Sequence, residues 1–209
     1  MSYTTEDAAW DEAYERMSDE LYPGHKAQAI IDFTHERLRS YYVANPNLLV
    51  PAVFTFKEAR ELLSCEHPTA ALVFSVSATE LFLKGALLKP VIYGLVHSDS
   101  LAELVVSAAL TQTGFRRYSQ LLAKLFREIT NTELESLTRG NSSKSLLAEA
   151  QELQETRNKI VHQGESVNIQ KAELAIDVAT GIFDKLLTPV LNELGFSVAK
   201  GGILVDDEI

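Results

Sequence analysis

The sequence predicts an all-α protein, an antiparallel helical bundle with an extra N-terminal acidic helix and a short C-terminal tail. Apolar residues recur at every third or fourth position along most of the 209-residue chain, which is the period of amphipathic helices. The chain has only 10 glycines and 6 prolines, and no strands alternate with helices. We therefore expect three parts: an N-terminal helical extension over 1–50, a helical bundle over 51–195, and a tail over 196–209.

The N-terminal extension is expected to hold two helices. Thr5 is a candidate cap for the first helix, which ends at Tyr22-Pro23-Gly24. The second helix spans about 25–42, and the turn Asn45-Pro46-Asn47 follows it. Residues 48–53 are predicted to form an extended connection into the bundle.

The bundle begins with a short helix from Thr55. Pro68 suits the first turn of a central helix, which runs from Ala70 to about Tyr93 and is apolar almost all round. Its length is close to that of a membrane span, but it contains the charged residues Glu80 and Lys84. We expect a buried core helix and no membrane partner.

Helical periodicity continues after the central helix, over 101–110 and 115–129. In the second of these segments the residues expected to face inward are Tyr118, Leu121, Leu122, Leu125 and Ile129. Residues 139–142 form a loop, and the last long helix spans about 171–194 with a kink or break at Pro189. In the tail, a Lys-Gly-Gly turn between apolar pairs is compatible with a small hairpin.

The helix that begins at about Ser143 places an arginine on its apolar face. Its apolar stripe steps by four, three, four and three residues through Leu146, Ala150, Leu153, Arg157 and Ile160. Gly164 is a predicted helix stop, so His162 falls in the last turn. An inward-facing cation and a titratable imidazole at a helix end are unfavourable unless they have partners or serve a function.

Charge is concentrated at the two ends of the chain. Of the net charge of −10, residues 1–20 carry −6 and residues 206–209 carry −3, so the rest sums to about −1. No bulk positive field attracts nucleic acid, and an RNA partner would need a local basic patch. The acidic ends either aid solubility, or the N-terminal helix covers a basic cleft or mediates assembly.

A motif near the end of a predicted helix is formed by Arg157, Asn158 and His162. In an all-helical chain with a central helix through 79–84, this motif resembles that of the HEPN superfamily. The resemblance covers roughly 52–194. It implies a metal-independent endoribonuclease that acts as a homodimer and has no cofactor. It also implies a role in a cytoplasmic prokaryotic toxin or antiviral defence system, with a cognate antitoxin or defence protein as a further partner. Some HEPN toxins carry a tyrosine two residues after the histidine as a modification site; here that position is Gly164.

The motif suits RNA cleavage on chemical grounds. His162 can serve as the general acid or base, and Arg157 stays charged and can bind phosphate oxygens. Residues five apart on a regular helix point about 140° away from each other. The two side chains therefore converge only if the backbone leaves the helix near Val161, and two copies of the motif meeting across a homodimer would supply both an acid and a base.

The remaining candidate site residues surround this motif. Lys159 and the pair Arg116 and Arg117 are predicted to bind substrate phosphates, although a solvated helix face is the default interpretation of such cations. Glu80 needs a partner if buried. That partner is either Arg157 or Asn158, which it would orient, or Lys84 one turn later.

Less active roles remain open for the same residues. The bundle could bind RNA or a nucleotide without turnover, or act as a scaffold in which His162 simply stabilises a helix end. The other histidines, at 25, 35, 67 and 97, have no metal-ligand spacing, and no metal site is expected. Cys65 is expected to be a buried structural thiol in a reducing compartment.

Overall fold

The computed structural model describes residues 35–95, 118–140 and 142–207. The chain divides into two compact units, Met1–Arg37 and Leu38–Ile209, and the second is described here. The first expected helix, the part of the second before residue 35 and the helix over 101–110 lie outside the described residues, as do Arg116 and Arg117.

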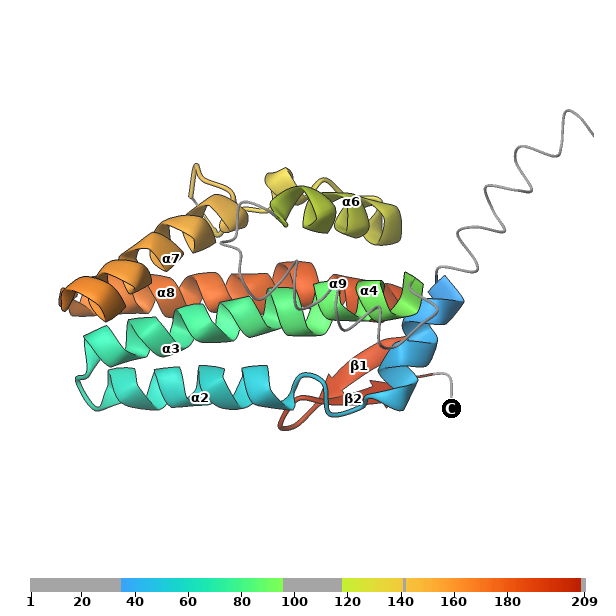
Figure 1. The fold of residues 1–209 in the computed structure, drawn as a ribbon, viewed down its shortest axis with the longest axis horizontal. Helices are drawn as coiled ribbons and strands as arrows, with labels where there is room; N and C mark the ends of the chain where they lie inside the picture. The colour runs from blue at the N-terminus through green and yellow to red at the C-terminus, as the bar shows by residue number, and fades with distance from the viewer. Residues whose placement is uncertain (1–34, 96–117, 141, 208–209) are drawn as a thin grey trace, which may run out of the picture. The chain divides into compact units, whose positions relative to one another are not determined.

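Helices form most of the described chain, as the sequence predicts (Figure 1). A helical segment ends at residue 44. The later elements are α2 Val50–Ser64, α3 Pro68–Glu80, η1 Leu81–Leu88, α4 Lys89–Leu95, α6 Ser119–Thr130, η4 Leu134–Ser136, α7 Leu146–Gln163, α8 Ile169–Ile182, η5 Phe183–Leu187, α9 Thr188–Glu193, β1 Phe196–Ala199 and β2 Ile203–Asp206. Elements η1 and η5 are π-helical, and η4 is a short 3-10 turn.

Two helical hairpins build the bundle. Helices α2 and α3 form the first hairpin, and α7 and α8 form the second (Figure 1). Helix α3 packs against α2, α7 and α8, so it is the central helix of this part of the chain. Its inward face is formed by fully buried residues such as Ala71, Leu72 and Ala78.

The start of α2 corrects one expectation. Residues 48–53 were predicted to be extended and the helix to begin at Thr55, but α2 already begins at Val50. Pro51 lies in its first turn, where the missing N–H has no helical partner to lose. Burial of Leu49 and Ala52 in the core fixes this earlier start.

The central helix begins at Pro68, as predicted, and continues without interruption through η1 into α4. The stretch Pro68–Tyr93 is the one described segment long and apolar enough to cross a membrane, and 61% of its most apolar part is buried inside the protein. That burial is compatible with the expected core helix of a soluble protein.

Each π-helical segment is followed closely by a proline. In a regular α-helix the carbonyl of Ala86 would accept a hydrogen bond from residue 90, but Pro90 has no N–H. The hydroxyl of Tyr42 donates to that carbonyl instead, at 2.6 Å. Pro189 likewise follows η5, so the last long helix continues into α9 through a widened π-helical turn and not through a break in the helix.

Helix α6 agrees with its prediction except on one residue. Leu122, Leu125 and Ile129 are buried as expected, but Leu121 is 43% exposed and Phe126 takes the inward place. The expected stripe was one position too wide, because residues 121 and 122 lie about 100° apart on a helix.

The tail is a packed hairpin. Strands β1 and β2 pair antiparallel, with Phe196 opposite Asp206. Phe196 is 1% exposed and belongs to the same core cluster as the bundle helices. Arg39 holds the hairpin from the helical side: its guanidinium donates to an Asp206 carboxylate oxygen at 2.6 Å and to the Leu194 carbonyl at 3.0 Å.

Candidate functional site

Helix α7 carries the candidate motif, and its two ends are fixed by local sequence. The Ser145 hydroxyl accepts a hydrogen bond from the Ala148 N–H and caps the start. Gly164, with φ 70°, ends the helix in a left-handed conformation, and its N–H donates to the Ile160 carbonyl at 3.1 Å. The predicted helix stop is therefore confirmed.

The helix does not break near Val161. Helix α7 runs to Gln163, so Arg157 and His162 both lie on regular helix. Their side chains leave the helix about 140° apart, and one protomer does not bring them together through its backbone. The condition for convergence within one chain is therefore not met, because Gly164 is the first residue that favours positive φ and the last helical turn is complete before it.

Arg157 occupies the inward stripe of α7, as its spacing predicts. The stripe residues before it are buried, and Arg157 itself is half-buried. One of its Nη atoms donates to the Asn158 side-chain oxygen at 3.2 Å. Its Nε–H is buried and has no hydrogen-bond partner among the described residues.

Arg157 also has no carboxylate beside it. Among the residues that the structure describes, no Asp or Glu lies within ion-pair distance of its guanidinium. The other arginines of helix α6 and the following loop differ: Arg127 pairs with Glu133, and Arg139 pairs with Glu149. A half-buried cation with an open N–H is a candidate ligand for an anion.

His162, Asn158 and Lys159 are exposed on the last two turns of α7. His162 is the basic residue of the final turn, where the carbonyl ends of the helix favour a cation. Val161, which lies between these candidate residues, exposes 52% of its surface. This end of α7 is thus open to solvent and carries both polar and apolar groups.

Glu80 has a partner that neither expectation assigned. The Gln154 side-chain amide donates to the Glu80 carboxylate at 2.5 Å. Gln154 lies three residues before Arg157 and so on the same face of α7. Lys84, the other expected partner, lies in the π-helical segment η1, where residues four apart no longer stack as they do on an α-helix.

A buried tyrosine adjoins this carboxylate. Tyr118 is 3% exposed, and burial, followed by the Glu80 charge, raises the pKa of its hydroxyl. The Lys84 ammonium lies 5.4 Å from the centre of the Tyr118 ring, which is a cation–π distance. Glu80 thus links α3 to α7 and lies close to the start of α6.

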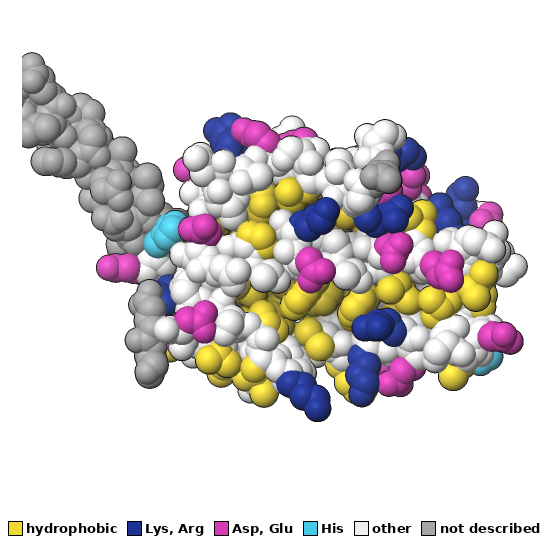
Figure 2. Space-filling view, turned by 180° about the vertical axis from the view of Figure 1, so that it is seen from behind, with side chains coloured by type: hydrophobic (Ala, Val, Ile, Leu, Met, Phe, Trp, Pro, Cys, Tyr) yellow, Lys and Arg dark blue, Asp and Glu magenta, His cyan; other side chains and the backbone are white. Residues whose placement is uncertain are grey.

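One face of the molecule is electrostatically mixed. Figure 2 shows an apolar band across one face, with Lys and Arg side chains interspersed with Asp and Glu along it. Among the described residues, no group of three or more His, Cys, Asp or Glu is placed to hold a metal ion. Cys65 is exposed, contrary to expectation, because the α2 helix ends at this residue and the chain turns into solvent.

No family model, no curated protein and no solved structure matches this chain. The sequence singles out Arg157 and His162 as candidates, but it does not single out Gln154, whose only signal was its place one turn before Arg157.

Proposed function

We propose that the protein is a metal-independent endoribonuclease of the HEPN type, which acts as a homodimer in a cytoplasmic prokaryotic toxin or defence system. Two features support this proposal: the bundle of two helical hairpins, and the Arg-Asn-x-x-x-His motif at the exposed end of α7. A cognate antitoxin or defence protein is a further partner in this proposal.

One observation carries the proposal. Arg157 is a half-buried cation with a buried N–H that has no partner and no neutralising carboxylate among the described residues. Burying a charge in this way is unfavourable unless a bound group of opposite charge completes the site. A phosphodiester oxygen fits, because it accepts hydrogen bonds from guanidinium in a bidentate geometry.

The reaction needs two proton transfers. A base removes the proton of the ribose 2′-hydroxyl, and the oxygen forms a bond to phosphorus. The bond from phosphorus to the 5′-oxygen breaks, and an acid protonates the leaving oxygen. Products are a 2′,3′-cyclic phosphate and a 5′-hydroxyl, and Arg157 stabilises the extra negative charge on the phosphorane.

His162 is the proton carrier in this scheme. One imidazole cannot be the base for the 2′-hydroxyl and the protonated acid for the 5′-oxygen at the same moment, and Arg157 and His162 diverge around the regular helix. A second copy related by a two-fold axis would supply the other imidazole. The exposed apolar side chain of Val161, between the two residues, suits a contact with that copy.

Cleavage of RNA in excess chelator tests the proposal. Wild type is expected to produce cyclic-phosphate ends, and His162→Ala is expected to lose the activity. Gln163→Ala, the next residue on the same exposed helix end, is the matched control and should retain it. Equal activity in wild type and His162→Ala, or activity only with added metal, would reject this mechanism.

A non-catalytic RNA- or nucleotide-binding module is the second candidate. The unbroken helix favours it, because Arg157 can bind a phosphate without any help from His162. In that case Arg157→Ala abolishes RNA binding, His162→Ala leaves it unchanged, and wild type gives no cleavage products.

A further inference from the structure

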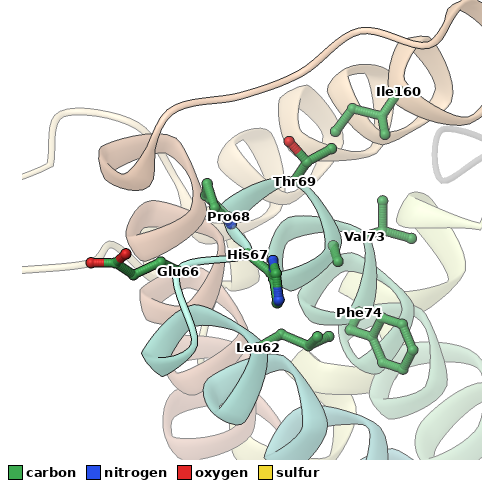
Figure 3. Close-up of a pocket in the computed structure, with 9 residues that line it drawn as sticks. Leu62, Glu66, His67, Pro68, Thr69, Val73, Phe74 and Ile160 are labelled. Atoms are coloured by element: carbon green, nitrogen blue, oxygen red, sulfur yellow. The ribbon is translucent and has the colours of Figure 1, made fainter.

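A pocket of about 630 Å³ opens beside the end of α7 that carries the motif. It lies at the turn between α2 and α3 and is closed on one side by Ile160 of α7 (Figure 3). Leu62, Val73 and Phe74 form apolar walls. Its volume falls in the range of small-molecule sites, which are commonly apolar with few polar groups.

Two flat rings line this pocket. Phe74 is 38% exposed, and the His67 imidazole projects toward Leu62 on the same side of the pocket in Figure 3. The Glu66 carboxylate points away from the pocket in the same view. Because the rings are exposed and no carboxylate points inward, the lining suits a flat, neutral, aromatic group.

The turn that forms the pocket is rigidly held. Glu66 has φ 59°, a conformation in which glycine is usual, and the N–H groups of Glu66 and His67 donate to the carbonyls of Leu63 and Leu62. On the opposite side, the Thr69 hydroxyl accepts a hydrogen bond from the Val167 N–H at 3.1 Å. The pocket walls are therefore fixed by backbone contacts.

The pocket and the arginine are neighbours on one helix face. Ile160 follows Arg157 by three residues, which is roughly 5 Å along the helix axis. Arg157 offers its unpartnered N–H to an anion. A planar neutral group held next to a bound phosphate is the arrangement within one nucleotide.

We infer that this pocket receives an unpaired base of single-stranded RNA, stacked against Phe74 and His67, while Arg157 holds the adjoining phosphate. The inference rests on the proposed function and names its substrate: unpaired RNA, since a base inside a duplex cannot enter the pocket. Aromatic and histidine rings are the usual stacking surfaces for such bases.

Binding of two uncleavable probes tests the inference. One is a short 2′-O-methyl oligonucleotide, and the other is a matched oligomer without bases. Wild type should bind the first more tightly, and Phe74→Ala should weaken that binding roughly tenfold while leaving the abasic oligomer unaffected. His67→Ala should act in the same direction. Phe54→Ala removes a 62% exposed phenylalanine of α2 outside the pocket and should change neither affinity.

The outcomes separate this inference from the proposed function. If wild type cleaves RNA but Phe74→Ala and His67→Ala bind both probes like wild type, the pocket assignment is overturned and the nuclease stands. If base-dependent binding is found without cleavage, the pocket stands and the catalytic proposal fails. If Phe74→Ala instead changes the oligomeric state with no loss of base-dependent affinity, the pocket is a contact between copies and the inference is overturned.

Discussion

Replacing Arg157 by methionine should stabilise the fold and abolish the function. The buried Nε–H of Arg157 has no partner among the described residues, and its position continues the apolar stripe of α7. Methionine has a similar length, fills irregular apolar space, and removes the unsatisfied donor.

The expected gain in stability follows from removing the buried Nε–H of Arg157, which has no hydrogen-bond partner among the described residues. A buried polar group without a hydrogen bond costs about 1–3 kcal/mol, whereas the bond from Arg157 to Asn158 is exposed and contributes little. We expect Arg157→Met to raise the free energy of unfolding by about 1–2 kcal/mol. For a chain of this size each kcal/mol raises Tm by roughly 2–4 °C.

Urea unfolding followed by circular dichroism measures the stability, and RNA cleavage measures the function. Loss of the arginine should lower the cleavage rate about 100-fold or more, because charge on the phosphorane loses its counter-charge. Arg127→Met is the matched control: Arg127 is 57% exposed and pairs with Glu133 at 3.5 Å, so its loss should change stability by less than about 0.5 kcal/mol.

The refuting result is a destabilised Arg157→Met protein. A loss of stability as large as the expected gain would mean that Arg157 is a structural partner of the core. Retained cleavage by a stabilised variant would instead remove Arg157 from the reaction. A gain of stability with loss of cleavage is the trade-off expected of a functional residue kept at a cost to the fold.

Three further predictions, made on four variants, test the packing of the fold, each by urea unfolding. Gly202→Ala should lower the free energy of unfolding by about 2–4 kcal/mol, because Gly202 has φ 86° and the new Cβ would come within 2.8 Å of a side chain. Gly201→Ala should lower it by only about 1–2 kcal/mol, because Gly201 has a similar φ of 84° but open space around it. Equal losses in the two variants would contradict the packing argument. Gln154→Ala should lower the free energy of unfolding by about 1–3 kcal/mol, because the Glu80 carboxylate loses the hydrogen bond from the Gln154 amide. An unchanged stability would show that water replaces this amide. Burial raises the pKa of the Tyr42 hydroxyl, so above about pH 10 only the unfolded chain releases the hydroxyl proton, and the stability of the fold decreases. Tyr42→Phe should lower the free energy of unfolding by about 1 kcal/mol at neutral pH and make its decrease at alkaline pH less steep. An unaltered pH profile of stability would exclude Tyr42 as the source of that decrease.

Local signals made the motif helix predictable. A serine cap, an apolar stripe with a period of three to four residues, and a glycine stop are all encoded within α7 itself. The helix begins at Leu146 with Ser145 as its cap, slightly later than the expected start at about Ser143, whereas the apolar stripe and the glycine stop lie where the sequence predicts them. The same holds for the start of α3 at Pro68, because a proline in the first turn needs no tertiary contact to be read.

Prolines inside or before helices were less informative. Residues 48–53 were predicted to be extended, yet α2 begins at Val50 with Pro51 in its first turn, and only burial of the neighbouring residues decides between the two. The π-helical segments η1 and η5 were not predicted either. They depend on tertiary packing as well as on the prolines, and the rings of Phe82 and Phe183 meet between them with centroids 5.4 Å apart.

The site was only half predictable for the same reason. The sequence indicates which residues of α7 can bind a phosphate and move a proton, since residue type and position on a helix are local properties. It does not indicate that Gln154 reaches Glu80 on α3, or that the α2–α3 turn leaves a pocket beside Ile160. These features join residues about 75 to 100 positions apart, and no periodicity encodes them.

Because α7 is a regular helix on which Arg157 and His162 diverge, the proposed catalysis requires a dimer. If a complete centre needs His162 from both copies, a dimer with one His162→Ala chain is inactive. Wild type and variant refolded together in equal amounts would then give about one quarter of the wild-type activity, because only that share of dimers carries two intact chains. Protomers that act alone would give about one half. Sedimentation must show a dimer in both samples, with Gln163→Ala as the mixing control. Activity proportional to the wild-type fraction would contradict the two-fold centre and leave Arg157 and His162 to act within one chain.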